Sequence, residues 1–523
     1  MKSLLRTAIA AACFIFLFSF ISGCWLQPEN VLGTLERETP QGTIIGQLHT
    51  HNGYECQRYL GIPYAKAPVG DLRFKPPQDP APFKNGKREA FDYGPMCPQL
   101  VYGVLLSGDE DCLFLNVWAP RDAKPGDRYP VMFFMHGGGN NLGSGNQALS
   151  DFLGMAEEAV ALDGLNYFFD RLKKITTLDE PIYQGNYLAA RHNVILVTIN
   201  YRLGQLGHLA HPDLGEGSGN FTFLDMVKAL QWVNRSIANF GGDRDNVTIF
   251  GESSGAWDVC ALMNMPAAKG LFHKAIMESQ ACLSRTIEQA EDYASPYIRA
   301  SGCSDAADVG ACLRKADINY FVTAMSYLYG LYWRSFGFIP HIPAVDGTVF
   351  PKHFAEAITT DQFNHVPLII GNNQNELAVA IASDIGFNCP LDANLAIFAR
   401  HLRAPMYQYR FVHHPLNDMI PVIHMFELPY VFGATRDLFG GTLKREIAVE
   451  NVVSSYWTSF ARTGDPNSGD QIYWPPYDRA SQRYLKLKAT PEEDAGDIIY
   501  YQNNCVLCDP LLNAVMGEQI VFW

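Results

Sequence analysis

The chain has 523 residues, of which 48% are hydrophobic and 18% are charged, a composition typical of a globular protein with a large core. Its 40 Lys and Arg residues against 54 Asp and Glu residues give a formal net charge of −14. This charge excludes nucleic acid as the expected partner, because nucleic-acid binding needs a positive face.

The first residues have the pattern of an export signal. Lys2 and Arg6 precede an apolar run from about Thr7 to Phe20. This run is too short to span a bilayer, which takes about 20 helical residues, and a short apolar run after positive charges indicates a secretory signal. The run ends in ISGC, residues 21–24, which resembles a bacterial lipobox. We therefore expect residues 1–23 to be a signal peptide and Cys24 to be lipidated; the alternative is an ordinary cleaved signal with a chance cysteine.

A lipidated Cys24 would make an N-terminal lipid anchor the only contact with a membrane. Trp25 follows, where an aspartate would resemble inner-membrane retention, so the sequence favours an outer-membrane lipoprotein facing the periplasm or the cell surface. A secreted soluble protein is the alternative. Export permits disulfides among the 12 cysteines. Cys505 and Cys508 form a lone CxxC without a second pair, so no metal site is expected.

The rest of the chain alternates apolar strands with amphipathic helices. Residues 31–50 indicate an antiparallel edge, and a helix is expected at about 223–237 and after residue 253. Strands are expected at about 111–120, 131–135, 194–200, 246–250, 367–371 and 406–412. Fully apolar strands separated by helices predict an α/β fold with a large, mostly parallel sheet covered by helices on both faces. In such sheets ligands bind at the carboxyl ends of the strands.

A serine between two glycines follows the strand at 246–250. The segment Gly251-Glu252-Ser253-Ser254-Gly255 fits a sharp strand-to-helix turn that would project Ser253 from the sheet as a nucleophile. The alternative, without a catalytic role, is a strand that ends in a Gly/Ser turn. An earlier strand opens into His136-Gly137-Gly138-Gly139, a loop whose amides could bind an oxyanion together with the amide of Ser254.

A serine nucleophile also needs a base and an acid, which follow it in the order acid then histidine in this fold. The strand at 367–371 leads to Glu376, the expected acid. The residues alone leave several candidates for the base, which are His401, His413, His414 and His424.

Several segments together resemble the type-B carboxylesterase/lipase family, the cholinesterase-like branch of the α/β-hydrolase fold. They include FGGDRDNVTIFGESSG, EDCLFLNVWAP, YLGIPYAKAP, TINYRLG, FIPHIPAVDG, HMFELPYVFG and YWTSFARTGDPN. The similarity extends from about Gly33 to Asp509. It implies one domain over residues 24–523 and a serine hydrolase that cleaves small carboxylic esters through an acyl-enzyme intermediate.

The resemblance also implies roles for individual residues. Ser253 matches the nucleophile, Glu376 the acid and His424 the general acid–base, while Gly138, Gly139 and Ser254 match the oxyanion amides. It implies no metal and no organic cofactor. The disulfides that it implies are Cys97–Cys112, Cys303–Cys312 and Cys389 with Cys505, or less favourably with Cys508. A lipase, an acyltransferase, or a non-catalytic adhesion member of the fold are the alternative functions; members of the last kind typically lack a triad residue.

The sequence departs from the family pattern at four places. Leu377 follows the acid where glycine is usual, and Asn140 follows the glycine triplet where an aromatic residue is usual. An insert at about 147–177 has apolar residues at helical spacing and predicts either a helical flap near the oxyanion loop or a surface hairpin. No tryptophan lies between Cys97 and Cys112, where choline-hydrolysing relatives carry one, which argues against a cholinesterase.

Overall fold

A computed structural model of the protein describes residues 31–101, 105–147, 181–322, 341–376, 384–415, 422–439, 444–469, 471–488 and 500–502. Several features expected from the sequence lie outside these residues. They are the signal segment with Cys24, the insert beyond Gln147, and the cysteines Cys505 and Cys508.

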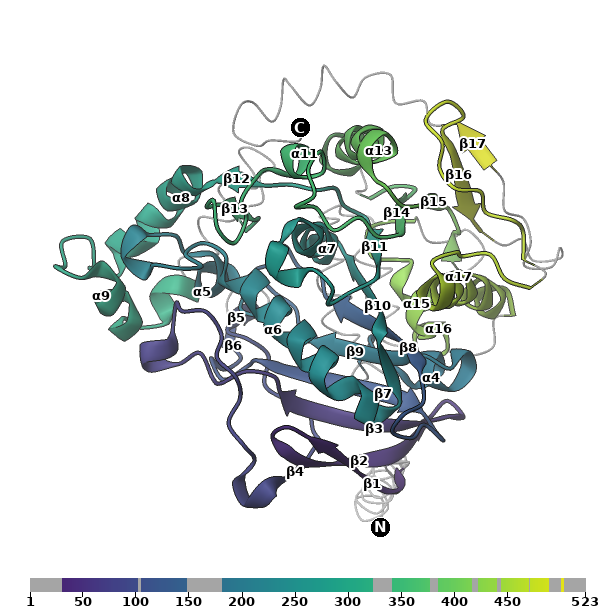
Figure 1. Ribbon diagram of the computed structural model, residues 1–523, viewed down its shortest axis with the longest axis horizontal. Coiled ribbons are helices and arrows are strands. Elements are labelled where there is room, and N and C mark those ends of the chain that lie inside the picture. Colours follow the sequence, from purple (N-terminus) through teal and green to yellow (C-terminus); the bar gives the residue numbers. More distant parts are fainter. Residues whose placement is uncertain are drawn as a thin grey trace, which may run out of the picture.

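One large twisted sheet runs through the molecule (Figure 1). Its strands lie in the order β1 (Val31–Thr39), β2 (Gly42–His51), β3 (Tyr54–Pro63), β7 (Phe114–Pro120), β9 (Ile195–Ile199), β8 (Tyr129–Met135), β10 (Gly242–Glu252), β11 (Lys274–Glu278), β14 (Leu368–Asn373), β15 (Met406–Phe411), β16 (Arg483–Leu487) and β17 (Tyr500–Gln502), with β4 (Lys87–Glu89) beside β2. In this order, each strand from β9 through β8, β10, β11, β14 and β15 to β16 is parallel to the next. Antiparallel pairs flank them at both ends, which confirms the predicted fold.

Short strands form two small additional sheets, β5 (Gln99–Val101) with β6 (Leu105–Ser107) and β12 (Arg285–Thr286) with β13 (Ala344–Val345). The described α-helices are α4 (Asn186–His192), α5 (Gly204–His208), α6 (Phe221–Ser236), α7 (Ser254–Asn264), α8 (Ile287–Ala300), α9 (Val309–Lys315), α11 (Phe354–Ala357), α13 (Cys389–His401), α15 (Leu428–Phe432), α16 (Thr435–Phe439) and α17 (Lys444–Thr463).

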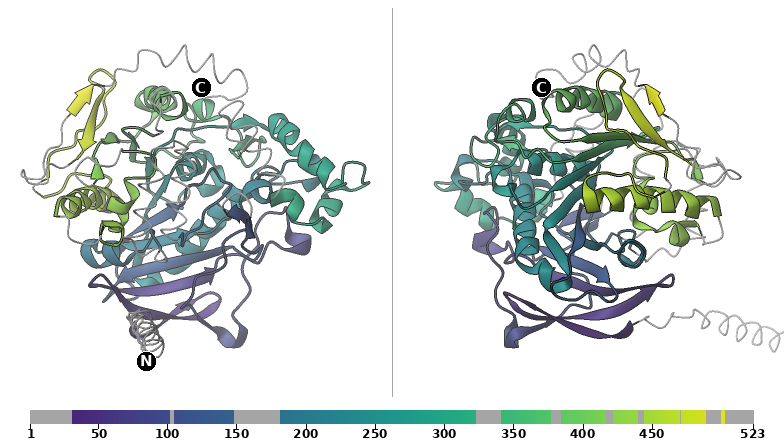
Figure 2. Two further views of the ribbon diagram at one scale, coloured as in Figure 1. Left: turned by 180° about the vertical axis from the view of Figure 1, so that it is seen from behind. Right: turned by 45° about the vertical axis from the view of Figure 1, so that its right-hand side comes forward.

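Helices cover both faces of the sheet, which explains why its central strands are apolar throughout (Figures 1 and 2). Phe133 of β8 packs in a cluster with residues of α6, α7 and α13. Its neighbour Phe134 points to the opposite face and packs with residues of α4, α15 and α17. Both aromatic side chains are fully buried. The sheet thus holds its strand ends rigidly between two hydrophobic layers.

Three disulfides join described residues. Cys97–Cys112 and Cys303–Cys312 are pairs that the resemblance implies. The third, Cys260–Cys282, was not expected and ties α7 to the segment after β11. Cys389 is buried at the start of α13. Its pairing with Cys505 stays a prediction. Disulfides are typical of proteins that reach an oxidising compartment.

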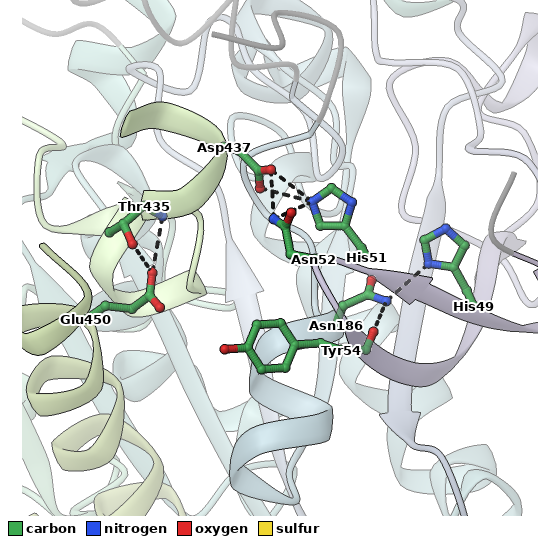
Figure 3. Close-up of polar contacts among 8 residues, drawn as sticks. All are labelled: His49, His51, Asn52, Tyr54, Asn186, Thr435, Asp437 and Glu450. Atoms are coloured by element: carbon green, nitrogen blue, oxygen red, sulfur yellow. Dashed lines mark hydrogen bonds and ion pairs between the residues drawn. The ribbon is translucent and has the colours of Figure 1, made fainter. Parts of the chain in front are cut away.

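Polar contacts fix α16 to the hairpin of β2 and β3. Figure 3 shows His51, the last residue of β2, and Asn52, in the turn that follows, directed at the carboxylate of Asp437 in α16. His51 Nε2 lies 3.0 Å from Asp437 Oδ2. In the same view Glu450 of α17 accepts hydrogen bonds from the backbone amide and the hydroxyl of Thr435.

Among the described helices, none combines the length and the apolar composition needed to cross a membrane.

Candidate active site

Ser253 lies at a strained turn between β10 and α7. Its φ of 58° and ψ of −124° are unusual for a residue with a Cβ atom, and such strain is common at functional sites. The Ser253 amide donates a hydrogen bond to the carbonyl of Glu278 at the end of β11, 2.9 Å away. Ser253 is partly exposed, whereas Glu252 and Ser254 on either side are buried. The turn therefore presents the serine between two buried neighbours.

The two glycines of the motif allow this turn to pack tightly. A Cβ atom on Gly255 would lie 2.1 Å from the carbonyl oxygen of Met135, the last residue of β8. A Cβ atom on Gly251 would lie 2.5 Å from the carbonyl oxygen of Gly255. No side chain fits at either position without a shift of the backbone. Glycine is required here by close approach of the chain to itself.

The glycine loop after β8 lies beside the serine. A Cβ atom on Gly137 would lie 3.1 Å from the Cβ atom of Ser253. Gly138 and Gly139 have φ values of 110° and 65°, which favour glycine. Within the part of the chain that the structure describes, no group accepts a hydrogen bond from the amides of Gly138, Gly139 or Ser254. These three amides are therefore available donors next to the turn.

The structure brings the expected acid and base together at the carboxyl ends of the strands. His424 Nδ1 lies 2.6 Å from Glu376 Oε2, and the His424 amide donates to the Glu376 carbonyl over 3.1 Å. The other carboxylate oxygen of Glu376 accepts a hydrogen bond of 2.6 Å from the amide of Asn373, the last residue of β14. The ring of Phe387 packs against the imidazole with centroids 4.9 Å apart. Glu376 and Phe387 thus fix the orientation of His424.

The second nitrogen of His424 faces the residue before Ser253. Nε2 lies 3.2 Å from Glu252 Oε1, within ion-pair distance but without the alignment of a hydrogen bond. The Glu252 side chain is fully buried, while that of His424 is 13% exposed. His424 therefore lies between the carboxylates of Glu376 and Glu252, and its Nε2 is directed at the strand end that carries Ser253.

Further buried carboxylates surround this pair. Glu427 lies 3.1 Å from the hydroxyl of Ser279 and 2.5 Å from the side-chain amide of Asn373. Glu278 accepts a hydrogen bond of 2.5 Å from the indole of Trp457. Burial and the charge of Glu376 nearby raise the pKa of Glu427 to about 7. Burial, with the charges of Glu427, Glu376 and Glu278, raises the pKa of Glu252 well above its usual range. Burial therefore favours the neutral form of these carboxyl groups.

One of the other histidine candidates, His413, pairs with a different glutamate. His413 Nε2 is 2.8 Å from Glu446 Oε2 of α17, where both side chains are buried. His401 ends α13, and His414 directly follows His413. Among the described contacts, only His424 is hydrogen-bonded to Glu376, so the structure narrows the alternatives that the residues alone left open.

Sequence reasoning missed most of the groups that support the site. Glu252 stood inside the quoted motif, yet its contact with His424 joins residues far apart in the chain. Asn140 was noted as a departure, but its hydrogen bonds to Ser254 and Asp258 were not foreseen. Glu278 is the last residue of β11 and Glu427 directly precedes α15, and neither position by itself indicated a place in the site.

Comparisons with known proteins show the family of this chain. A profile of the family described as "Carboxylesterase family" matches residues 34–167, 174–382 and 377–506. The para-nitrobenzyl esterase of Bacillus subtilis is 33% identical over 508 residues, which cover 86% of this chain and 94% of that protein. The medium-chain fatty acyl-CoA hydrolase precursor of Anas platyrhynchos is 32% identical, with 89% of each chain covered.

Solved structures of esterases also resemble this chain. A structure of a PNB esterase superposes with a TM-score of 0.70 at 30% sequence identity and covers 91% of this chain and 99% of its own. A structure titled as a thermophilic PNB esterase gives a TM-score of 0.71 at 28% identity with the same coverage. The chain therefore belongs to the carboxylesterase family and is an α/β-hydrolase of carboxylic esters.

Proposed function

We propose that the protein hydrolyses small carboxylic esters through an acyl-enzyme intermediate on Ser253. In this reaction Ser253 Oγ attacks the ester carbonyl carbon while His424 Nε2 takes the hydroxyl proton. The tetrahedral intermediate then collapses, the bond to the alkoxide breaks, and Nε2–H protonates the leaving alcohol. Water then attacks the acyl carbon while His424 Nε2 takes a proton from it. The acyl–Oγ bond breaks, and Nε2–H returns the proton to Ser253 Oγ as the carboxylic acid leaves.

Glu376 orients the base and stabilises its cation in this proposal. Its 2.6 Å contact with Nδ1 keeps the Nδ1–H tautomer, which leaves the lone pair of Nε2 free to accept the serine proton. Burial raises the pKa of Glu252, which disfavours a carboxylate beside Nε2 and so disfavours a second strong ion pair with the imidazolium. The proton on Nε2 therefore remains available to the leaving group.

The amides of Gly138, Gly139 and Ser254 would hold the oxyanion. They lack acceptors among the described residues and flank the turn at Ser253. Such donors stabilise charge that develops in the transition state, and the loss of one typically lowers the rate by roughly 100- to 1000-fold. No metal and no organic cofactor takes part in the proposed steps.

The observation that carries the proposal is the short His424–Glu376 contact beside a serine with a φ of 58°. The test is hydrolysis of p-nitrophenyl acetate by wild type, Ser253→Ala and a matched surface control, Ser301→Ala. Ser253→Ala should lose roughly 10⁴- to 10⁶-fold in kcat. The hydroxyl of Ser301 donates to the carbonyl of Ile298 in its own turn, so this position should tolerate alanine without loss of activity. Esterase activity retained by Ser253→Ala would refute the proposal.

The substrate class can be refined on the same site. p-Nitrophenyl esters of graded acyl length would define the acyl pocket. Comparing soluble with emulsified esters separates an esterase from a lipase, and an added alcohol acceptor reveals acyl transfer. We take small soluble esters as the substrate, because the relatives of this chain include para-nitrobenzyl esterase.

For its location we propose an exported protein held at the outer membrane by lipid on Cys24. The ISGC tetrapeptide after the apolar run supports lipidation, and three disulfides fit an oxidising compartment. Labelling with radioactive palmitate in a bacterial host should modify wild type but not Cys24→Ala, which should also leave the membrane fraction. Equal labelling of both proteins would contradict the lipid anchor.

A further inference from the structure

The residue after the glycine triplet, Asn140, is held by hydrogen bonds on several sides. Its amide donates to Ser254 Oγ over 3.0 Å, and its carbonyl accepts from the amide of Gly204 over 2.7 Å. Its side-chain Nδ2 donates to Asp258 Oδ1 over 2.9 Å and to the carbonyl of His341 over 3.1 Å. Asn140 is fully buried, with a φ of 54° that Asn accepts more readily than most residues. The end of the glycine loop is therefore bonded directly to α7.

Further contacts hold the start of the glycine loop, at His136. The Tyr201 hydroxyl donates to the carbonyl of His136 over 2.5 Å, and the Tyr201 ring stacks on the His136 imidazole with centroids 4.3 Å apart. Tyr201 also lies beside Asp258. Asn140, Asp258, Tyr201 and His136 thus form one chain of contacts from one end of the loop to the other.

The protonation of Asp258 completes this chain. Asp258 lies on α7 with no exposure to solvent, and burial raises its pKa well above the usual range. A protonated Asp258 can donate to the Tyr201 oxygen while its Oδ1 accepts from Asn140 and Tyr201 donates to His136. The Oδ2 atom of Asp258, which has no other hydrogen-bond partner among the described residues, then has one in Tyr201.

This network matters because the available amides belong to two separate segments. Gly138 and Gly139 come from the loop after β8, and Ser254 opens α7. Glycines alone do not fix a loop, and a displacement of about 1 Å at a catalytic group can cost roughly 100-fold in rate. We infer that Asn140 and Asp258 are positioning residues that set the distance between the glycine-loop amides and the Ser254 amide, and so shape the oxyanion hole.

The inference rests on the proposed function and adds residues that do not touch the substrate. It predicts a specific kinetic signature. Loss of either side chain should lower kcat and weaken a transition-state analogue, because the oxyanion forms only in the transition state. Binding of the ground-state ester, seen in KM, should change little.

The experiment compares Asp258→Leu, Asp258→Asn and Asn140→Gly with a control, Asn264→Leu. Asn264 is a buried polar residue of the same helix whose side chain donates to the carbonyl of Lys352 over 2.9 Å, away from the loop. We measure kcat and KM on p-nitrophenyl acetate, and Ki for an alkyl trifluoromethyl ketone, which adds to the serine as a tetrahedral oxyanion. Thermal melts report stability for each variant.

Asp258→Leu and Asn140→Gly should lose about 100-fold in kcat and in ketone affinity, with KM within threefold of wild type. Asp258→Asn should recover most of the rate lost in Asp258→Leu, because its amide can donate to Tyr201 and its oxygen can accept from Asn140. Asn264→Leu should lower the melting temperature without weakening the ketone.

Wild-type ketone affinity in both Asp258→Leu and Asn140→Gly would overturn the inference. Should Asp258→Leu fail to fold, Asn140→Gly decides alone, because glycine accepts the φ of 54° at that position. The result is distinguishable from a failure of the proposed function. Activity retained by Ser253→Ala removes the proposed mechanism, whereas an inactive Ser253→Ala with a fully active Asn140→Gly removes only the positioning role.

Discussion

Replacing Gly255 by alanine tests how tightly the serine turn is packed. The new Cβ atom would lie 2.1 Å from the Met135 carbonyl oxygen and 3.0 Å from that of His136. Contacts below 3.0 Å are essentially never seen for real Cβ atoms, so the start of α7 must move from β8 by about 0.9 Å. β8 is buried between β9 and β10 in the sheet, so the helix start, with Ser253 and Ser254, is the part that yields.

Two effects compete in this substitution, and their magnitudes differ. Helix propensity alone favours alanine over glycine by about 1 kcal/mol inside a helix. Overpacking a rigid site costs about 1–3 kcal/mol and displaces catalytic groups, and a shift near 1 Å can cost roughly 100-fold in rate. We expect the steric effect to dominate, with kcat/KM on p-nitrophenyl acetate lowered about 100-fold and a lower melting temperature.

The matched control is Gly33→Ala, because a Cβ atom on Gly33 of β1 would have no neighbour within 4 Å. The control should keep its kcat/KM and its melting temperature. A Gly255→Ala enzyme with kcat/KM within threefold of wild type and an equal or higher melting temperature would refute the argument from packing.

Three other predictions concern the acid, the unexpected disulfide and a buried carboxyl. Glu376→Gln removes the charge that holds the Nδ1–H tautomer of His424 and should lower kcat by roughly 10⁴-fold in steady-state kinetics. The control Glu356→Gln, at an exposed position, should leave kcat unchanged. A loss in kcat below tenfold for Glu376→Gln would contradict the role of Glu376. Replacing both Cys260 and Cys282 by alanine should lower the free energy of unfolding by about 3 kcal/mol, because the unfolded chain gains the entropy of a loop closed over a separation of 22 residues. The measurement is the midpoint of urea unfolding, and an unchanged midpoint would contradict this prediction. Burial raises the pKa of Glu450 from 4.5 to about 7, so its carboxyl stabilises the fold below about pH 4.5 and this contribution is lost as the pH rises through 7. Relative to Glu450→Gln, wild type should therefore lose about 2–3 kcal/mol of unfolding free energy between pH 5 and pH 8, and parallel pH profiles would argue against the raised pKa.

The fold could be predicted from the sequence because its signal is local and repeated. Apolar runs such as residues 131–135 are typical of strands buried on both faces, and the structure places Phe133 and Phe134 in opposite layers. The turn at Ser253 was also predictable, since the glycines that permit it lie two positions before and two positions after the serine.

Features that depend on contacts between residues far apart in the sequence were harder to predict. The residues alone left four histidines open, and only the fold places His424 against Glu376. Cys260 and Cys282 gave no pairing signal, because both positions follow strand ends whose adjacency in the sheet sets their distance. Asn140 and Asp258 belong to different segments, so neither suggested the other.

The most direct test of the central claim is to identify the residue that carries the covalent intermediate. A fluorophosphonate should inactivate the enzyme with a stoichiometry of one, and trypsin should then release the labelled peptide 245–269 after reduction of the disulfide at Cys260. We predict that fragment spectra place the adduct on Ser253 and not on the adjacent Ser254, with no label on the Ser253→Ala protein. An adduct on another residue, or full inactivation without modification of Ser253, would contradict the account.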